Sequence, residues 1–268
     1  MIDRGKFNIL GVQINAIDYA AAVERIITAA QNQQPLAVTA LAVHGVMTGV
    51  LDKTQRYRLN HLDLITPDGQ PVRWALNRLH ATGLTDRVYG PTLTLKLCER
   101  AAVENLPIYL YGSKPETLDL LAKNLTTQFP ALKIAGMQPS MFRRVTPAEK
   151  LQIASQIQAS GAKLVLVGLG CPRQETWAYE YRDALPMPLI AVGAAFDFHA
   201  GTVPQAPAWM QKRGLEWFYR LTREPSRLWK RYLLLNPLYL WLLLLQATHL
   251  KVNDPTDAVP PAEEMRYG

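Results

Sequence analysis

The stretch that decides the fold runs from Gly168 to Arg231 and reads GLGCPRQETWAYEYRDALPMPLIAVGAAFDFHAGTVPQAPAWMQKRGLEWFYRLTREPSRLWKR. A glycine turn follows an apolar strand, a second apolar strand leads to Asp197, and the stretch ends in a strongly basic segment. Glycine turns expose backbone amides and basic side chains supply cations, and both kinds of group bind phosphate. The stretch therefore predicts a site for a phosphorylated ligand beside an α/β sheet.

The composition is that of a folded protein with anionic partners. The chain has 268 residues, 49% of them hydrophobic, which is enough for one large domain, alone or with an appendage. Its formal net charge of +7 favours phosphorylated small molecules, anionic lipid or nucleic acid as partners. Two cysteines, Cys98 and Cys171, are too few for a disulfide framework, which favours a reducing compartment. Residues 1–12 lack the apolar region of a signal peptide, so a cytoplasmic protein is expected.

Short apolar runs alternate with helical patterns along most of the chain, which indicates an α/β fold with a Rossmann-like, largely parallel sheet flanked by helices. Strands are expected at Asn8–Ile14, Leu36–Ala42, Leu62–Thr66, Ile108–Gly112, Leu132–Ala135, Lys163–Val167 and Leu189–Gly193. The changes in composition divide the chain into a catalytic core (1–205), a basic and apolar helical appendage (206–250) and a Pro-rich, acidic tail (251–268) that is expected to be flexible.

Two polar residues stand at turns in the first half of the core. Asp68 lies in the turn Pro67-Asp68-Gly69 after a strand, and ligands bind at the carboxyl ends of the strands in open α/β sheets. The alternative for Asp68 is an Asx-turn or a cap on the helix around Val72–Leu79. Arg87 precedes a Gly-Pro turn, where it holds a phosphate or carboxylate or is simply solvated.

Glycine turns and their neighbours supply the second group of candidates. Gly112 ends one strand, and Gly168 and Gly170 end another, so their backbone amides can receive a diphosphate. Gln174 carries both donors and an acceptor, which suit sugar hydroxyls. Glu175 is interpreted as a helix cap or as a buried partner of a nearby base.

Further along the chain, Asp197 follows a strand and can bind a ribose, hold a structural cation or cap a turn. His199 is expected to be structural, because no serine or cysteine nucleophile pairs with it by motif. No spacing of His, Cys and Asp resembles a metal site, so no metal is expected.

The appendage begins with cations and continues with lipophilic residues. Arg220, Arg227, Lys230 and Arg231 share one face of a helix unless Pro225 breaks it, and a merely solvated face is the alternative. The next segment, Tyr232–Leu245, is short of the roughly 20 residues that span a bilayer. Basic residues before it favour insertion into a membrane interface, and contact with another subunit is the alternative.

Residues 8–231 resemble the WecG/TagA/CpsF family of bacterial glycosyltransferases. The motifs that carry the resemblance are Pro67-Asp68-Gly69, Arg87-Val88-Tyr89-Gly90, Tyr111-Gly112, Gly168-Leu169-Gly170-Cys171-Pro172-Arg173-Gln174-Glu175, Phe196-Asp197 with Ala200-Gly201, Ala206-Pro207, Gly214-Leu215-Glu216-Trp217 with Tyr219-Arg220, and Glu224-Pro225 with Arg227 and Arg231. The resemblance implies an inverting, metal-independent transfer of a sugar from a UDP-sugar to a polyprenyl-diphosphate-linked saccharide, in cell-surface polysaccharide or exopolysaccharide biosynthesis. It also implies a peripheral location at the inner face of the cell membrane.

The resemblance assigns roles to individual residues. It implies that Asp68 is the general base and that Thr39, Arg87 and Gln174 belong to the catalytic pocket. Cations of the appendage would close over the nucleotide diphosphate, and they correspond to Arg220 and Arg227 with Lys230 or Arg231 as the third. No cofactor is implied, because arginines would take the place of a divalent ion.

One segment departs from the family pattern. The chain has Thr39-Ala40-Leu41-Ala42-Val43-His44, where the family commonly carries polar residues at the positions of Leu41 and Val43. Sugar recognition depends on such hydrogen bonds, so glucose or glucuronic acid is as good an expectation for the donor sugar as N-acetylmannosamine. The alternative function is an inactive nucleotide- or lipid-binding accessory protein. The expected partners are the UDP-sugar, the lipid-linked acceptor, an anionic membrane surface and a second copy in a homo-oligomer, but not nucleic acid.

Overall fold

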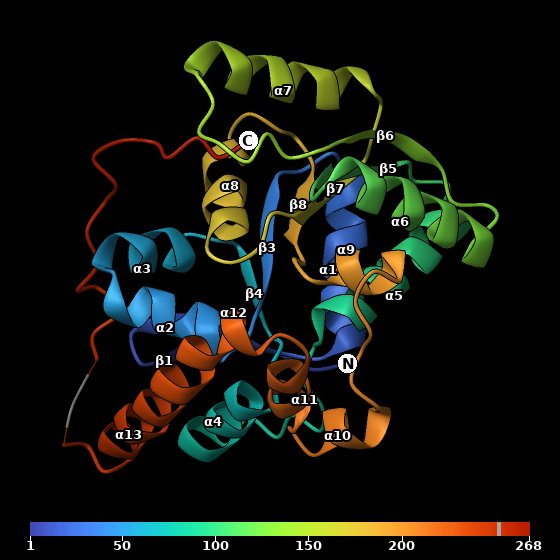
Figure 1. Ribbon diagram of the computed structural model, residues 1–268. Coiled ribbons are helices and arrows are strands. Elements are labelled where there is room, and N and C mark those ends of the chain that lie inside the picture. The colour runs from blue at the N-terminus through green and yellow to red at the C-terminus, as the bar shows by residue number, and fades with distance from the viewer. Residues whose placement is uncertain (251–252) are drawn as a thin grey trace.

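The computed structural model describes residues 1–250 and 253–268, except for the side chains of Arg227, Lys230 and Arg231. A six-stranded sheet with helices on both faces forms the centre of the molecule (Figure 1). Its strand order is β4-β3-β8-β7-β5-β6 and every neighbouring pair is parallel. The strands are β3 (Leu36–Leu41), β4 (Leu64–Pro67), β5 (Ile108–Gly112), β6 (Ile134–Gln138), β7 (Leu164–Gly168) and β8 (Pro188–Ala191). The expected parallel α/β sheet is thus confirmed.

Apolar residues alternate along the strands and fill two cores, one on each face of the sheet. In β7, Val165 and Val167 belong to one core and Leu164 and Leu166 to the other. The first core is covered by α2 (Val43–Leu51), α3 (Lys53–Asn60), α4 (Gln70–His80), α7 (Pro147–Ala159) and α8 (Arg173–Tyr181). The second is covered by α1 (Tyr19–Gln31), α5 (Gly90–Val103), α6 (Pro115–Gln128) and α9 (Ala195–Ala200).

The N-terminal segment differs from the sequence-based expectation. A single strand at Asn8–Ile14 was wrong, because the chain reverses at Leu10 and Gly11, which have φ of 55° and 89°. The result is an antiparallel hairpin of β1 (Asp3–Ile9) and β2 (Val12–Ile17). The turn residue Leu10 is apolar and fully buried, so in the sequence the turn looks like part of a continuous apolar strand.

The appendage contains four α-helices and a π-helical turn, all of which follow α9. They are α10 (Ala208–Lys212), α11 (Glu216–Arg223), α12 (Pro225–Lys230), the π-helix Arg231–Leu235 and α13 (Asn236–Ala247). Pro225 is the first residue of α12, and Glu224 before it has φ of −132° and ψ of 59°, so the cations do not lie on one continuous helix. In the described part of the chain, no helix combines the length and apolar character needed to cross a bilayer.

Helix α13 is part of the fold as well as part of the surface. Its inward side chains Tyr239 and Leu242 are buried in the first core, and α13 packs against α2. The Gln246 side chain accepts a hydrogen bond from Leu10 N (2.9 Å) and donates one to Asn8 O (3.0 Å). The appendage is therefore anchored to the hairpin and the core at its far end.

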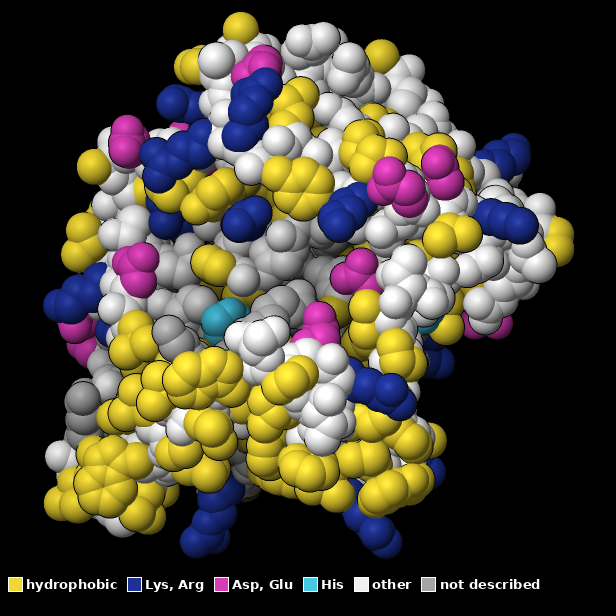
Figure 2. Space-filling view, viewed as in Figure 1, with side chains coloured by type: hydrophobic (Ala, Val, Ile, Leu, Met, Phe, Trp, Pro, Cys, Tyr) yellow, Lys and Arg dark blue, Asp and Glu magenta, His cyan; other side chains and the backbone are white. Residues whose placement is uncertain are grey.

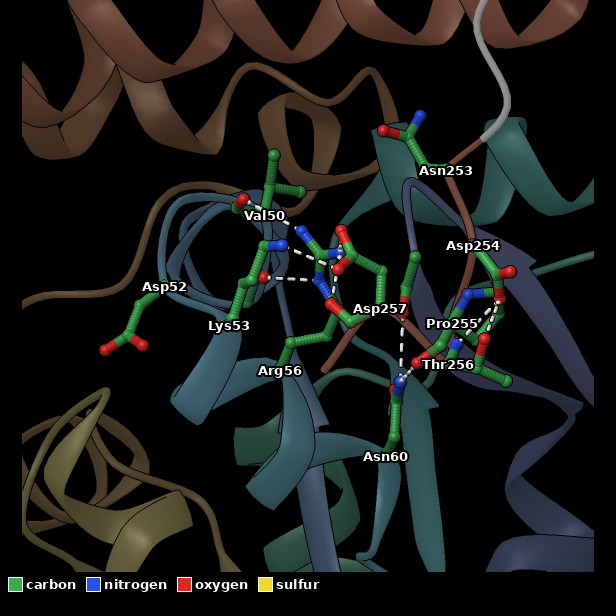
Figure 3. A network of polar contacts seen from close by, with 12 residues as sticks. Val50, Asp52, Lys53, Arg56, Asn60, Asn253, Asp254, Pro255, Thr256 and Asp257 are labelled. Carbon is green, nitrogen blue, oxygen red and sulfur yellow. Dashed lines mark hydrogen bonds and ion pairs between the residues drawn. The ribbon is translucent and has the colours of Figure 1, made fainter. Parts of the chain in front are cut away.

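The tail runs back along the core from residue 253 to residue 268. Asp257 pairs with Lys53 (2.6 Å), and its backbone oxygen accepts a hydrogen bond from Arg56 (Figure 3). At the other end, Glu180 of α8 accepts hydrogen bonds from the backbone amides of Met265 (2.7 Å) and Arg266 (2.8 Å). These contacts bind the tail to α3 and α8, although its composition predicts a flexible segment.

Candidate active site

A pocket of about 770 Å³ lies at the carboxyl ends of the parallel strands. Residues that follow β3, β4, β5, β7 and β8 line it, and α11 of the appendage contributes its outer wall. Figure 2 shows the molecule hollowed above the apolar lower part of this face. Of the residues predicted from the sequence, those in the pocket wall are Asp68, Arg87, Gly168, Gly170, Gln174, Glu175, Asp197 and Arg220.

Asp68 lies in the turn between β4 and α4. Its Oδ1 accepts a hydrogen bond from the backbone amide of Gly90 at 3.1 Å, and α4 has no side-chain cap. Burial raises the pKa of Asp68 to about 7, and the Glu216 carboxylate also raises this pKa, whereas Arg87, the Gly90 amide and Arg220 lower it. A carboxylate whose pKa lies near neutrality can accept a proton from a substrate at physiological pH.

An ion pair connects the core to the appendage beside Asp68. Arg87 Nη2 lies 2.8 Å from Glu216 Oε2, and the two side chains are only 9% and 13% exposed. The Tyr89 hydroxyl donates a hydrogen bond to the other Glu216 oxygen at 2.9 Å. The Arg87 guanidinium also lies 4.1 Å from the centre of the Tyr89 ring. Glu216 was expected only as a motif residue, although it precedes Arg220 by four residues, the spacing of one helix face.

Thr39 does not line the pocket but supports its floor. It is fully buried, and its hydroxyl donates a hydrogen bond to Glu175 Oε1 at 3.0 Å. Gln174 Nε2 donates to the same oxygen at 2.9 Å, and Gln174 Oε1 accepts from the Gly170 amide at 3.1 Å. Glu175 is 1% exposed, and burial raises the pKa of its carboxyl. Thr39, Gln174 and Glu175 therefore form one network that fixes the turn after β7.

The glycines allow two strands to approach at the edge of the pocket. Gly112 has φ of +107°, and a Cβ there would lie 2.8 Å from the backbone of Gly168, its partner across β5 and β7. Gly112 itself stays behind the wall, and the next residue, Ser113, lines the pocket. A Cβ on Gly168 would meet the ring of Phe196 at 2.5 Å. A side chain at Gly112 would force the ends of β5 and β7 apart, and one at Gly168 would displace the Phe196 ring of α9.

The remaining predicted residues lie on the side of α9 and the appendage. Asp197 is part of α9 and borders the pocket. The guanidinium of Arg220, on α11, lies 5.6 Å from the Phe198 ring. The other three predicted cations belong to α12 and the π-helix, but their side chains lie outside the described part of the structure; they are Arg227, Lys230 and Arg231. Among the described residues, no three His, Cys, Asp or Glu side chains are grouped to hold a metal ion.

A pocket with charged side chains at the carboxyl edge of an open parallel sheet is characteristic of doubly wound α/β proteins that bind phosphorylated ligands. Residues 7–253 match the model of the glycosyl transferase WecG/TagA/CpsF family. The chain belongs to this family of glycosyltransferases. It is 34% identical over 176 residues to a Bacillus subtilis (strain 168) protein, the N-acetylglucosaminyldiphosphoundecaprenol N-acetyl-beta-D-mannosaminyltransferase. That match covers 65% of this chain and 66% of the relative.

Proposed function

We propose that the protein is an inverting, metal-independent glycosyltransferase that moves a sugar from a UDP-sugar to a polyprenyl-diphosphate-linked saccharide. The observation that carries the proposal is the position of Asp68, a carboxyl with a pKa of about 7 in a pocket that also holds Arg87 and Arg220. Family membership and the activity for which the Bacillus subtilis relative is named support it.

In the proposed reaction Asp68 accepts the proton of an acceptor hydroxyl, and the hydroxyl oxygen forms a bond to the anomeric carbon of the donor sugar. The bond between that carbon and the UDP oxygen breaks on the opposite face, which inverts the configuration. Negative charge then grows on the diphosphate, and the cation of Arg220 stabilises it. The appendage cations Arg227, Lys230 and Arg231 are assigned the same task.

The backbone amides after β5 and β7 are proposed to receive the donor. Gly112 precedes Ser113, and Gly168 and Gly170 border the turn at the pocket. Gln174 and Glu175 are proposed to recognise the sugar, and Asp197 the ribose. Thr39 acts through Glu175, whose carboxyl it positions.

The donor sugar is proposed to be N-acetylmannosamine, glucose or glucuronic acid. The relative is named for transfer of N-acetylmannosamine. Leu41 and Val43 line the pocket of this chain and offer no hydrogen bond from their side chains. Binding of a panel of UDP-sugars, followed by product analysis with a short-chain polyprenyl-diphosphate acceptor, distinguishes the three.

The decisive test is the Asp68→Asn variant. It keeps an oxygen for the Gly90 amide but cannot take a proton, so transfer should fall by about 10² to 10⁴. Unchanged transfer would remove Asp68 from the role of base. The apolar Leu41 and Val43 favour an alternative, an inactive accessory protein of polysaccharide assembly. That alternative predicts UDP-sugar binding without the slow hydrolysis expected of an enzyme.

The apolar face of the appendage is proposed to dock on an anionic membrane surface, which would put the protein at the inner face of the cell membrane. Apolar side chains gather over the lower part of the face in Figure 2, where α11 and α13 lie in Figure 1. The most exposed of them within the helices of the appendage are Trp209, Phe218, Leu233, Leu234, Leu240, Trp241 and Leu244. Apolar area beside cations is the arrangement of interfacial helices.

Deletion of the whole segment would also remove Tyr239 and Leu242 from the core, so surface substitutions are the better test. Replacing Leu240 and Trp241 together by serine should reduce co-sedimentation with phosphatidylglycerol-containing vesicles. Leu120→Ser on α6, an exposed leucine elsewhere, is the matched control. Unchanged sedimentation together with a lower oligomeric mass would favour the homo-oligomer instead.

A further inference from the structure

Helix α11 lies over the pocket with little apolar anchoring. All eight of its residues are described, and none is buried. Its aromatic side chains Trp217 and Phe218 are 37% and 51% exposed. By contrast, the Glu216 carboxylate at its start reaches two core residues through separate oxygens, Arg87 at 2.8 Å and Tyr89 at 2.9 Å. The polar contact, and not apolar burial, therefore carries the attachment of α11 to the core at this point.

The same contact determines where Arg87 points. Its guanidinium donates a hydrogen bond to Glu216 at 2.8 Å and a longer one to Gln211 Oε1 at 3.4 Å, and it stacks on Tyr89. Tyr89 directly precedes Gly90, whose amide donates a hydrogen bond to Asp68, and Arg87 lies two residues before Tyr89. A chain of contacts therefore runs from the appendage through Arg87 and Tyr89 to the candidate base.

We propose that Glu216 is a positioning residue that fastens α11 over the pocket and holds Arg87 and Tyr89 in place beside Asp68. This inference rests on the proposed function, since it concerns the base of that reaction. Glu216 then couples the closure of the pocket by α11 to the protonation of Asp68. The energetic reason is that a partly buried carboxylate is stable only while its cation and hydroxyl partners stay in place.

The charges around Asp68 give the sign of this coupling. The titratable and charged groups that interact with it are Tyr19, Arg87, Tyr89, Glu216 and Arg220. Glu216 raises the pKa of Asp68 as a like charge, and Arg87 lowers it as an opposite charge. Loss of the Glu216 charge removes this raising influence and so lowers the pKa of Asp68.

The test compares Glu216→Gln with Glu99→Gln, which removes the same charge from an exposed position on α5. Amide hydrogen exchange over residues 216–223 needs no substrate. It should be about tenfold faster or more in Glu216→Gln and unchanged in Glu99→Gln. Exchange as slow as in the unmodified protein would overturn the proposal, because α11 would then be held by other contacts.

The second measurement separates positioning from a merely structural role. The acidic limb of the pH profile of kcat/KM should move to lower pH in Glu216→Gln and stay in place in Glu99→Gln. Faster exchange without this shift would overturn the link to Asp68. Should the unmodified protein transfer no sugar, the proposed function fails. The inference is then still decided by exchange and by the titration of Asp68, followed by carboxyl NMR.

Discussion

Asp68→Asn should gain stability relative to the unmodified protein as the pH rises, while it lowers the rate of transfer. The pKa of Asp68 is raised from 3.8 to about 7 in the folded protein. Between these two values the folded protein binds more protons at this site than the unfolded chain does. Its free energy of unfolding therefore falls as the pH rises through this window, and a variant that cannot ionise here does not share that loss.

The size of the effect follows from the shift. One pKa unit corresponds to about 1.4 kcal/mol, and a rise from pH 5 to pH 8 crosses about two units of the window. The upper limit is therefore about 3 kcal/mol. Asp68 borders an open pocket, so solvent screens part of this cost. We expect the stability advantage of Asp68→Asn to grow by about 1–3 kcal/mol between pH 5 and pH 8.

Urea denaturation of both proteins at the two pH values measures this growth, and the difference between pH values cancels effects that do not depend on pH. Asp183→Asn is the matched control, because the Asp183 side chain is 87% exposed. An advantage that stays constant within about 0.5 kcal/mol would refute the reasoning, since Asp68 would then ionise in the folded protein as easily as in the unfolded chain.

Three further substitutions test the packing around the pocket and the tail. Gly112→Ala places a Cβ against the Gly168 backbone at positive φ and should lower the free energy of unfolding by about 1–3 kcal/mol; a loss below 0.5 kcal/mol, on the order of measurement error, would contradict this. Thr39→Val removes the hydrogen bond to the buried Glu175 carboxylate and should lower the free energy of unfolding by about 1–3 kcal/mol, measured by urea denaturation. Unchanged stability would mean that this hydrogen bond contributes nothing. Glu180→Gln weakens the acceptor of two tail amides and should speed hydrogen exchange at residues 265–266; equal exchange rates would show that other contacts hold the tail.

The central sheet could be predicted because its strands are short, apolar on both faces and separated by helical patterns. The strands expected at Leu36–Ala42 and Lys163–Val167 agree with β3 and β7 to within one residue at each end. The N-terminal hairpin could not be predicted, because its turn is formed by the buried Leu10 in a left-handed conformation. Helix α3 has five charged or amide side chains in eight residues and almost no apolar periodicity, so it carries no strong signal.

Only some residues of the candidate site could be predicted from the sequence. Turns after strands identify Asp68 and the glycines, because the carboxyl edge of a parallel sheet gathers them without regard to their distance along the chain. A polar residue inside a strand does not show from the sequence which way its side chain points. Thr39 is such a residue, and its hydroxyl contacts Glu175 beneath the pocket. The pairing of Glu216 with Arg87 joins residues 129 positions apart and depends on how the appendage folds back.

The packing of the appendage limits how the pocket can open. Helix α13 cannot leave the core as a unit without exposing Tyr239 and Leu242 and breaking the hydrogen bonds of Gln246. Helix α11 has no buried residue, and its Glu216 carboxylate pairs with Arg87 of the core. The free-energy cost of movement is therefore concentrated in α13, and opening is expected within α10–α12. A membrane contact made through the outer face of α13 would then hold the core at a fixed distance from the membrane surface while α11 opens and closes over the pocket.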